Sequence, residues 1–250
     1  MKPISLTIFA ACCLTAAECA IANPYEYVGR EHNRALEALG VQNSFAGLDK
    51  RLTLTHMLQT TSEHLCENGI TQNKTDKNCI QQYAGFSTEV LNDLRYAIYP
   101  EGGTDQIVKG YIDAFSKKGN FNAVQLRELE NLYRLLPNED NIDDLYYLSE
   151  RIEEFDRYIA TQLSQQEAEP VLLGSAVMKA SLEYWLLQLH TTSNWISNET
   201  NTQEARRKWL RKALKLIAAD AAGCALGSPG GPLGCVAGGV ALSAGTASTF

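Results

Sequence analysis

The C-terminal end of the chain is unusual because no charged side chain occurs in the thirty residues that follow Asp220. Eight of these residues are glycine and seven are alanine, so large apolar side chains are scarce there. Several glycines fall four residues apart: Gly223/Gly227, Gly230/Gly234 and Gly234/Gly238. Small residues one helical turn apart leave a groove that lets a second helix approach closely. The segment Ser228–Pro232 interrupts any helix, so we expect a hairpin of two closely packed helical arms.

A cluster of cations precedes this segment. Six positive side chains fall within ten residues, and Trp209 lies among them: Arg206, Arg207, Lys208, Arg211, Lys212 and Lys215. A basic helix that carries Trp and continues into an uncharged segment is typical of proteins at an anionic membrane surface. We therefore take the six cations, Trp209, Gly234 and Gly238 as candidate residues for binding a membrane or a partner helix, including a second copy of this chain. Two alternatives are a hairpin packed on the rest of the protein and a disordered end.

The rest of the chain has helical periodicity, and no segment shows the two-residue alternation of a strand. Start and stop signals delimit eight helices, at roughly 23–40, 48–66, 86–98, 104–119, 122–136, 142–163, 170–189 and 201–222. Asn23 and Asn122 are expected to cap two of them, and Pro170 suits a first helical turn. We expect an all-α bundle of about seven or eight helices, in which residues 23–200 form the body and residues 201–250 the basic helix and Gly/Ala-rich hairpin tail.

The first twenty-two residues have the features of a secretory signal peptide. Lys2 gives a positive start, an apolar run follows from Ile4 to Leu14, and Ala20-Ile21-Ala22 is a suitable cleavage site. The apolar run is shorter than the roughly 20 residues of a membrane span. An uncleaved anchor and a lipoprotein cysteine are the alternatives. We expect a protein that is secreted or periplasmic after removal of residues 1–22.

Four cysteines remain after this cleavage: Cys66, Cys79, Cys224 and Cys235. An even number in an oxidising compartment predicts structural disulfides. Four cysteines allow three pairings, and we favour Cys66–Cys79 and Cys224–Cys235 because each pair encloses a short, turn-rich stretch. Metal ligation and reactive thiols are the alternatives, but the close Cys/His spacing of a zinc site is absent from the sequence.

The sequence offers little catalytic chemistry. It contains no phosphate-binding loop, no nucleophile elbow and no H-E-x-x-H or E-x-x-H metal motif. Its four histidines are scattered along the chain: His32, His56, His64 and His190. For Ser175, spacing identifies no histidine or aspartate that could activate it as a nucleophile. The acidic runs near Asp143 and Glu153 lack the pattern of a calcium loop and fit a solvated helix face. We therefore expect no cofactor, no metal and no catalytic residues. The net charge of -7 also argues against nucleic acid as a partner.

The N-terminal string at residues 23–33 reads Asn23-Pro24-Tyr25-Glu26-Tyr27-Val28-Gly29-Arg30-Glu31-His32-Asn33. It resembles the mature start of a group of exported bacterial proteins with no assigned activity, in which the pattern is N-P-Y-x-x-V-G-x-x-H-N. Some of these proteins close with a Gly/Ala-rich tail, to which Ala218–Ser248 is similar. That tail also resembles the glycine-zipper region of two-peptide bacteriocins, which permeabilise membranes. The resemblance implies a helical protein and supplies no catalytic residues. Two residues of the N-terminal string, His32 and Asn33, have no role in starting the helix. They form either a polar site or hydrogen bonds inside the bundle.

These observations predict an exported, disulfide-stapled helical protein whose small-residue hairpin engages a membrane or a partner helix, with bacterial antagonism as one role. A second hypothesis is an extracytoplasmic helical module that binds a small molecule or a peptide, for which a deep apolar cavity is required. A third is a hydrolase in which two of His56, His64 and His190 converge with a carboxylate. The position of residues 221–250, docked on the body or projecting from it, distinguishes the first two hypotheses.

Overall fold

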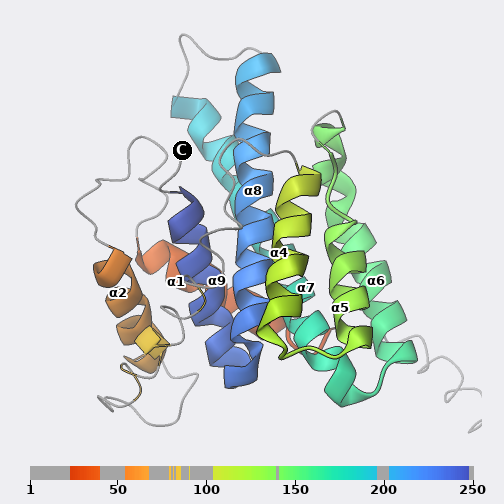
Figure 1. Cartoon of the computed structure of the whole chain (residues 1–250). Helices are drawn as coiled ribbons and strands as arrows, with labels where there is room; N and C mark the ends of the chain where they lie inside the picture. Colours follow the sequence, from red (N-terminus) through yellow and green to blue (C-terminus); the bar gives the residue numbers. More distant parts are fainter. Residues whose placement is uncertain are drawn as a thin grey trace, which may run out of the picture.

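The computed structural model describes residues 23–39, 54–67, 79, 81, 83–85, 90, 104–138, 141–195 and 203–247. These residues form eight α-helices and two short 3-10 helices and contain no strand (Figure 1): α1 (Glu26–Ala38), α2 (Leu54–Glu67), α4 (Thr104–Lys118), α5 (Ala123–Tyr133), η3 (Ile142–Tyr147), α6 (Leu148–Gln162), α7 (Gln165–Trp195), α8 (Gln203–Gly227), η4 (Ser228–Gly230) and α9 (Gly231–Ala247). The predicted all-α bundle with a C-terminal hairpin is confirmed. Apart from Val90, the helix predicted over 86–98 lies outside the described residues.

The hairpin is formed by α8 and α9, and four glycines lie where the two helices cross. A Cβ atom on Gly223 would lie 2.1 Å from the carbonyl oxygen of Gly238, and one on Gly227 would lie 2.0 Å from that of Gly234. Only a hydrogen atom fits between backbones at this separation. Gly231 begins α9 with a φ of 70°, a left-handed value that favours glycine. The small residues of the tail therefore serve the contact between its own two arms.

Two disulfides staple the chain, with the pairing that the sequence predicts. Cys66, at the end of α2, is bonded to Cys79. Cys224 of α8 is bonded to Cys235 of α9 and joins the two arms of the hairpin. Two disulfides are compatible with folding in an oxidising compartment.

The hairpin lies at the centre of the bundle. Helix α9 packs on α1, α2, α7 and α8 (Figure 1), and thirteen of its seventeen residues are buried. The longest helix, α7, packs on α1, α5, α6 and α8, and α4 lies against α5 and α8. Within the described residues, no helix is both long enough and apolar enough to cross a membrane. The uncharged end of the chain is thus part of the hydrophobic core.

Helix α7 begins at Gln165, five residues before the predicted start at Pro170. Ser164 and Glu167 form a reciprocal cap at this end: the backbone N–H of Ser164 donates to Glu167 Oε2, and that of Glu167 donates to Ser164 Oγ. Proline has no N–H for the carbonyl of Gln166, four residues earlier. That carbonyl accepts a hydrogen bond of 3.3 Å from the Gln125 side chain of α5 instead. The predicted start at Pro170 was wrong because Ser164 and Glu167 cap the helix one turn earlier, and Pro170 lies in its second turn.

Candidate functional site

The cations of α8 occupy its N-terminal half, which reaches past the ends of the neighbouring helices in Figure 1. We call these six residues the basic face: Arg206, Arg207, Lys208, Arg211, Lys212 and Lys215. The first four are exposed and the last two are half-buried. From Leu216 to Gly227 every residue of the same helix is buried. One continuous helix therefore holds the basic face on the surface and is fixed at its other end in the core.

Two cations of the basic face make no ion pair within the described residues. Among the described residues, no carboxylate lies within ion-pair distance of Arg207 or Lys208. The pKa of Lys212 is lowered, first by partial burial of its ammonium group and second by repulsion from Lys208. The basic face is therefore a site of positive potential on a protein whose net charge is -7.

Trp209 lies within the basic face in sequence but not fully on the surface. Its side chain is half-buried and packs against the hydrophobic core of the bundle. An aromatic side chain from outside α8, Tyr146 of η3, contacts a residue of the basic face. Arg206 donates a hydrogen bond of 2.9 Å to the Tyr146 hydroxyl, and its guanidinium lies 5.4 Å from the centre of the ring. Sequence reasoning missed Tyr146 because it lies sixty residues away along the chain.

Gly234 and Gly238, the predicted tail members of the binding site, are buried against α8 of the same chain. The Cβ position of Gly234 lies 2.3 Å from the carbonyl oxygen of Gly227, and that of Gly238 lies 2.2 Å from the carbonyl oxygen of Gly223. The groove that small residues leave is therefore filled within the molecule. Of the predicted binding residues, only those of the basic face lie at the surface.

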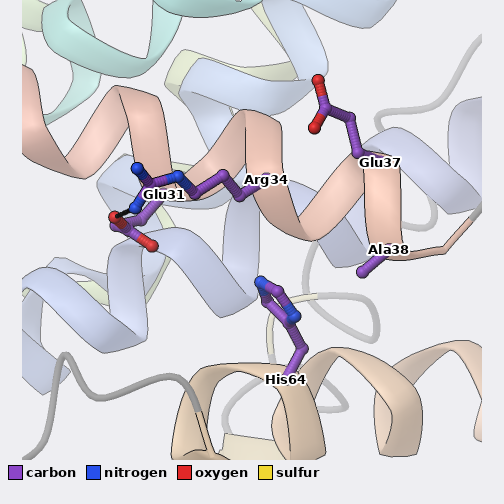
Figure 2. Close-up of a pocket in the computed structure, with 5 residues that line it drawn as sticks. All are labelled: Glu31, Arg34, Glu37, Ala38 and His64. Atoms are coloured by element: carbon purple, nitrogen blue, oxygen red, sulfur yellow. Dashed lines mark hydrogen bonds and ion pairs between the residues drawn. The ribbon is translucent and has the colours of Figure 1, made fainter.

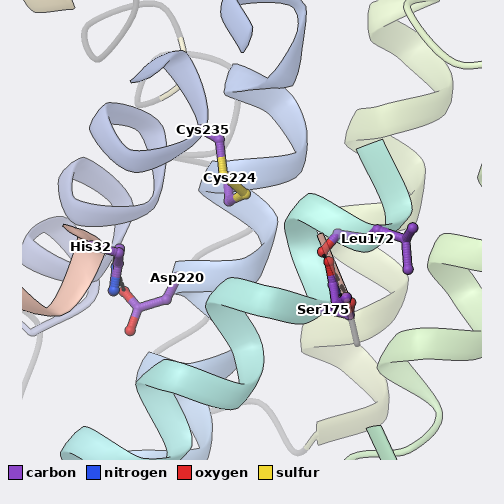
Figure 3. The surroundings of a disulfide bond; sticks show 7 residues. His32, Leu172, Ser175, Asp220, Cys224 and Cys235 are labelled. Atoms are coloured by element: carbon purple, nitrogen blue, oxygen red, sulfur yellow. Dashed lines mark hydrogen bonds and ion pairs between the residues drawn. A yellow bond between two sulfur atoms is a disulfide. The ribbon is translucent and has the colours of Figure 1, made fainter. Parts of the chain in front are cut away.

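His32 and Asn33 belong to a buried polar network that joins α1 to α7 and α8. His32 Nε2 lies 3.3 Å from Asp220 Oδ1, and Figure 3 shows the two side chains pointing toward each other. Ser181 and Trp185 of α7 donate to the other oxygen of Asp220. Asn33 Nδ2 donates to the carbonyl oxygen of Ala180, 2.8 Å away. Burial, and next the nearby charge of Asp220, raise the pKa of Tyr111. Because His32 and Asp220 are fully buried, this network is a structural centre rather than a surface site.

A second buried carboxylate, Asp156 of α6, anchors the start of the described chain. Asn23 Nδ2 donates to Asp156 Oδ2 at 3.0 Å, to Ser175 Oγ and to the carbonyl oxygen of Leu172. Ser175 also donates to Asp156 Oδ1, and Figure 3 includes Ser175 and Leu172 on α7. The prediction that Asn23 caps α1 was wrong: the N-cap residue is Tyr25, and the amide of Asn23 reaches into the body instead. Ser175 likewise has a structural partner, and no histidine takes part in its described hydrogen bonds.

A surface hollow of about 450 Å³ lies between α1 and α2 and is lined by Glu31, Arg34, Glu37, Ala38 and His64. Arg34 pairs with Glu31, and Figure 2 shows Glu37 pointing away from His64. Charged side chains from exposed helix faces differ from the apolar, enclosed lining of a typical ligand cavity. The side chains of His56 and His190 lie outside the described residues. In the described part of the chain, no group of three His, Cys, Asp or Glu side chains is placed to hold a metal ion.

Comparisons with protein families, with curated proteins and with solved structures found no match to this chain.

Proposed function

We propose that this chain is an exported, non-enzymatic helical protein that binds an anionic membrane surface through the basic face of α8. The observation that carries the proposal is the division of α8 into an N-terminal half with six cations, four of them exposed, and a fully buried half that contains no cation. A basic surface that the fold already holds rigid loses less conformational entropy on binding than a mobile basic segment does.

Charge asymmetry supports a membrane as the partner. Without its six basic-face cations the chain carries a net charge of -13, because -7 minus 6 is -13. An anionic bilayer repels that remainder and attracts the basic face, so the field of the membrane orients the molecule with the N-terminal half of α8 toward the lipid. The small-residue groove, which would suit a partner helix, is occupied by α8 of the same chain. A lipid surface therefore fits better than a partner helix.

The test is co-sedimentation with vesicles of phosphatidylcholine alone or mixed with phosphatidylglycerol, at low and at physiological salt. The triple variant Arg207→Gln, Lys208→Gln and Arg211→Gln leaves the contact between Arg206 and Tyr146 in place. Each cation near an anionic surface contributes about 1 kcal/mol, so the variant should bind anionic vesicles about a hundredfold more weakly than the wild type.

The matched control removes the same charge elsewhere. Lys117, Arg134 and Arg157 are exposed cations on α4, the end of α5 and α6, and their change to Gln lowers the net charge by the same amount. Binding of this control should stay within a factor of about two of the wild type. Equal loss in both variants would mean that net charge rather than the basic face governs binding, and absence of wild-type binding at low salt would refute the proposal.

We propose bacterial antagonism as a more specific role of the same membrane-binding surface. It adds permeabilisation to binding and requires the buried hairpin to leave the bundle. Release of a dye from the same anionic vesicles measures this step. Binding without release would leave the membrane proposal standing and remove permeabilisation from it.

A further inference from the structure

Two large aromatic side chains are exposed at the end of η3, which packs on α8. Tyr146 and Tyr147, the last residues of η3, expose 38% and 63% of their surface. Most of the large apolar and aromatic side chains in the described chain are buried in the core. Two adjacent exposed tyrosines are therefore a feature that the packing of the bundle does not require.

Tyr146 contacts Arg206 of the basic face, and Tyr147 follows Tyr146 in the sequence. The hydrogen bond and the cation–π contact with Arg206 fix the ring of Tyr146 against α8. The 3-10 helix itself is held by Ile142 and Leu145, which are both buried, and it packs on α8 and α6. Tyr146 is thus held against Arg206, and Tyr147 follows it at the exposed end of a short element with a buried apolar side.

We propose that Tyr146 and Tyr147 form with the basic face a single membrane-interface anchor, in which the cations attract the anionic bilayer and the Tyr147 ring enters its headgroup layer. This inference rests on the proposed function and adds to it the residues that give binding its apolar component. It also reassigns the aromatic part of the site, because the half-buried Trp209 packs on the core. The occupant of the surface is an anionic lipid bilayer.

Tyrosine suits this position for a physical reason. Its ring is apolar and its hydroxyl is polar, so the side chain is stable where hydrocarbon meets water, and tyrosine is enriched at that depth in membrane proteins. Salt screens the attraction between cations and lipid, but it does not weaken the burial of an aromatic ring. The two parts of the anchor therefore differ in their response to salt.

The test compares Tyr147→Ser with Tyr158→Ser in the full chain, using vesicles that contain phosphatidylglycerol at low and at physiological salt. Tyr158 is a matched control because it is 47% exposed and lies on α6, where its ring neighbour is Phe155. We expect Tyr147→Ser to bind about tenfold more weakly at both salt concentrations, since the loss is apolar. Tyr158→Ser should bind like the wild type, and Tyr147→Trp should bind at least as tightly as the wild type.

Thermal unfolding checks that each variant is folded, and the exposure of both tyrosines predicts unchanged midpoints. Wild-type binding with equal affinities for Tyr147→Ser and Tyr158→Ser would overturn the anchor while leaving the basic-face proposal intact. A loss of binding by Tyr147→Ser that is present at low salt and absent at physiological salt would also overturn it, because screening by salt does not remove an apolar contribution. Failure of the wild type to bind these vesicles would refute both proposals.

Discussion

At the scale of single residues, the N-terminal string is explained by contacts with α6, α7 and α8. Asn23 hydrogen-bonds to α6 and α7, and Asn33 donates to a carbonyl oxygen of α7. Gly29 lies so close to α7 that a Cβ atom would be 2.4 Å from the carbonyl oxygen of Ala176. His32 lies against Asp220 of α8. Each of these residue types is suited to docking α1 on the body, so the string is a structural motif in this chain.

Asp156 makes stability depend on pH in a direction that can be measured. Burial raises its pKa from 3.8 to about 6, although hydrogen bonds from Ser175 and Asn23 act in the opposite direction. A carboxyl whose pKa is raised by folding contributes stability that is complete below the unfolded pKa and is lost as the pH rises through the folded pKa. The shift corresponds to about 3 kcal/mol, lost between about pH 4 and pH 7.

The variant Asp156→Asn should remove this dependence, because an amide still accepts hydrogen bonds but does not ionise. Urea unfolding across this pH range should show the wild-type free energy of unfolding falling by about 3 kcal/mol relative to the variant as the pH rises. All other titrating groups are common to both proteins and cancel in the difference. Parallel pH profiles would contradict a raised pKa of Asp156.

At the scale of elements, the crossing of α8 and α9 depends on the absence of side chains. Gly223 faces Gly238, and Gly227 faces Gly234, at separations where a methyl group overlaps a backbone oxygen. Glycine costs about 1 kcal/mol of helix propensity at each of these positions. Close packing of the backbones and burial of the flanking residues offset that cost.

Gly223→Ala should therefore destabilise the protein, whereas Gly174→Ala should stabilise it. The new Cβ at residue 223 would lie 2.1 Å from the Gly238 oxygen, and the two arms must separate to admit it. In contrast, the nearest atom to a Cβ at Gly174 of α7 is 3.6 Å away, an ordinary contact. We expect a loss of about 3 kcal/mol for Gly223→Ala and a gain of about 0.5–1 kcal/mol for Gly174→Ala, measured by chemical unfolding. Equal effects of the two substitutions would mean that the close crossing is not present in solution.

Local signals made parts of the elements predictable. The pairing of Cys224 with Cys235 followed from an eleven-residue separation around a turn, and the Asn122–Gln125 capping box was recognised from two residues three apart. The start of α7 was misplaced because Pro170 was assigned to the first turn, whereas the local cap of Ser164 and Glu167 begins the helix at Gln165. The exposed Tyr147 was missed because the apolar pattern predicted one continuous helix over 142–163, whereas a 3-10 helix precedes α6. The cap and disulfide signals are local, whereas the contact between Gln125 and Gln166 joins two helices and cannot be recognised from spacing.

At the scale of the whole molecule, the least amphipathic helices, α7, α8 and α9, form the centre and the more amphipathic helices surround them. α9 contacts four other helices, and its residues are small enough for these helices to approach closely. The basic face extends from this centre on α8, so the proposed membrane site and the core share one helix. A deletion that is meant to remove the membrane site would therefore also remove part of the core.

Truncation after Gly230 tests this dependence of the body on its tail. Loss of α9 exposes the buried faces of α1, α2, α7 and α8 and leaves Cys224 without its disulfide partner. We expect the truncated chain to have no cooperative thermal unfolding transition by circular dichroism, whereas a chain of residues 23–250 retains one. If the truncated chain unfolded cooperatively with the helix content of α1–α8, the hairpin would be an appendage rather than the core. Vesicle binding must in either case be tested with side-chain variants of the full chain, since a truncated protein that fails to bind has also lost the support of its basic face.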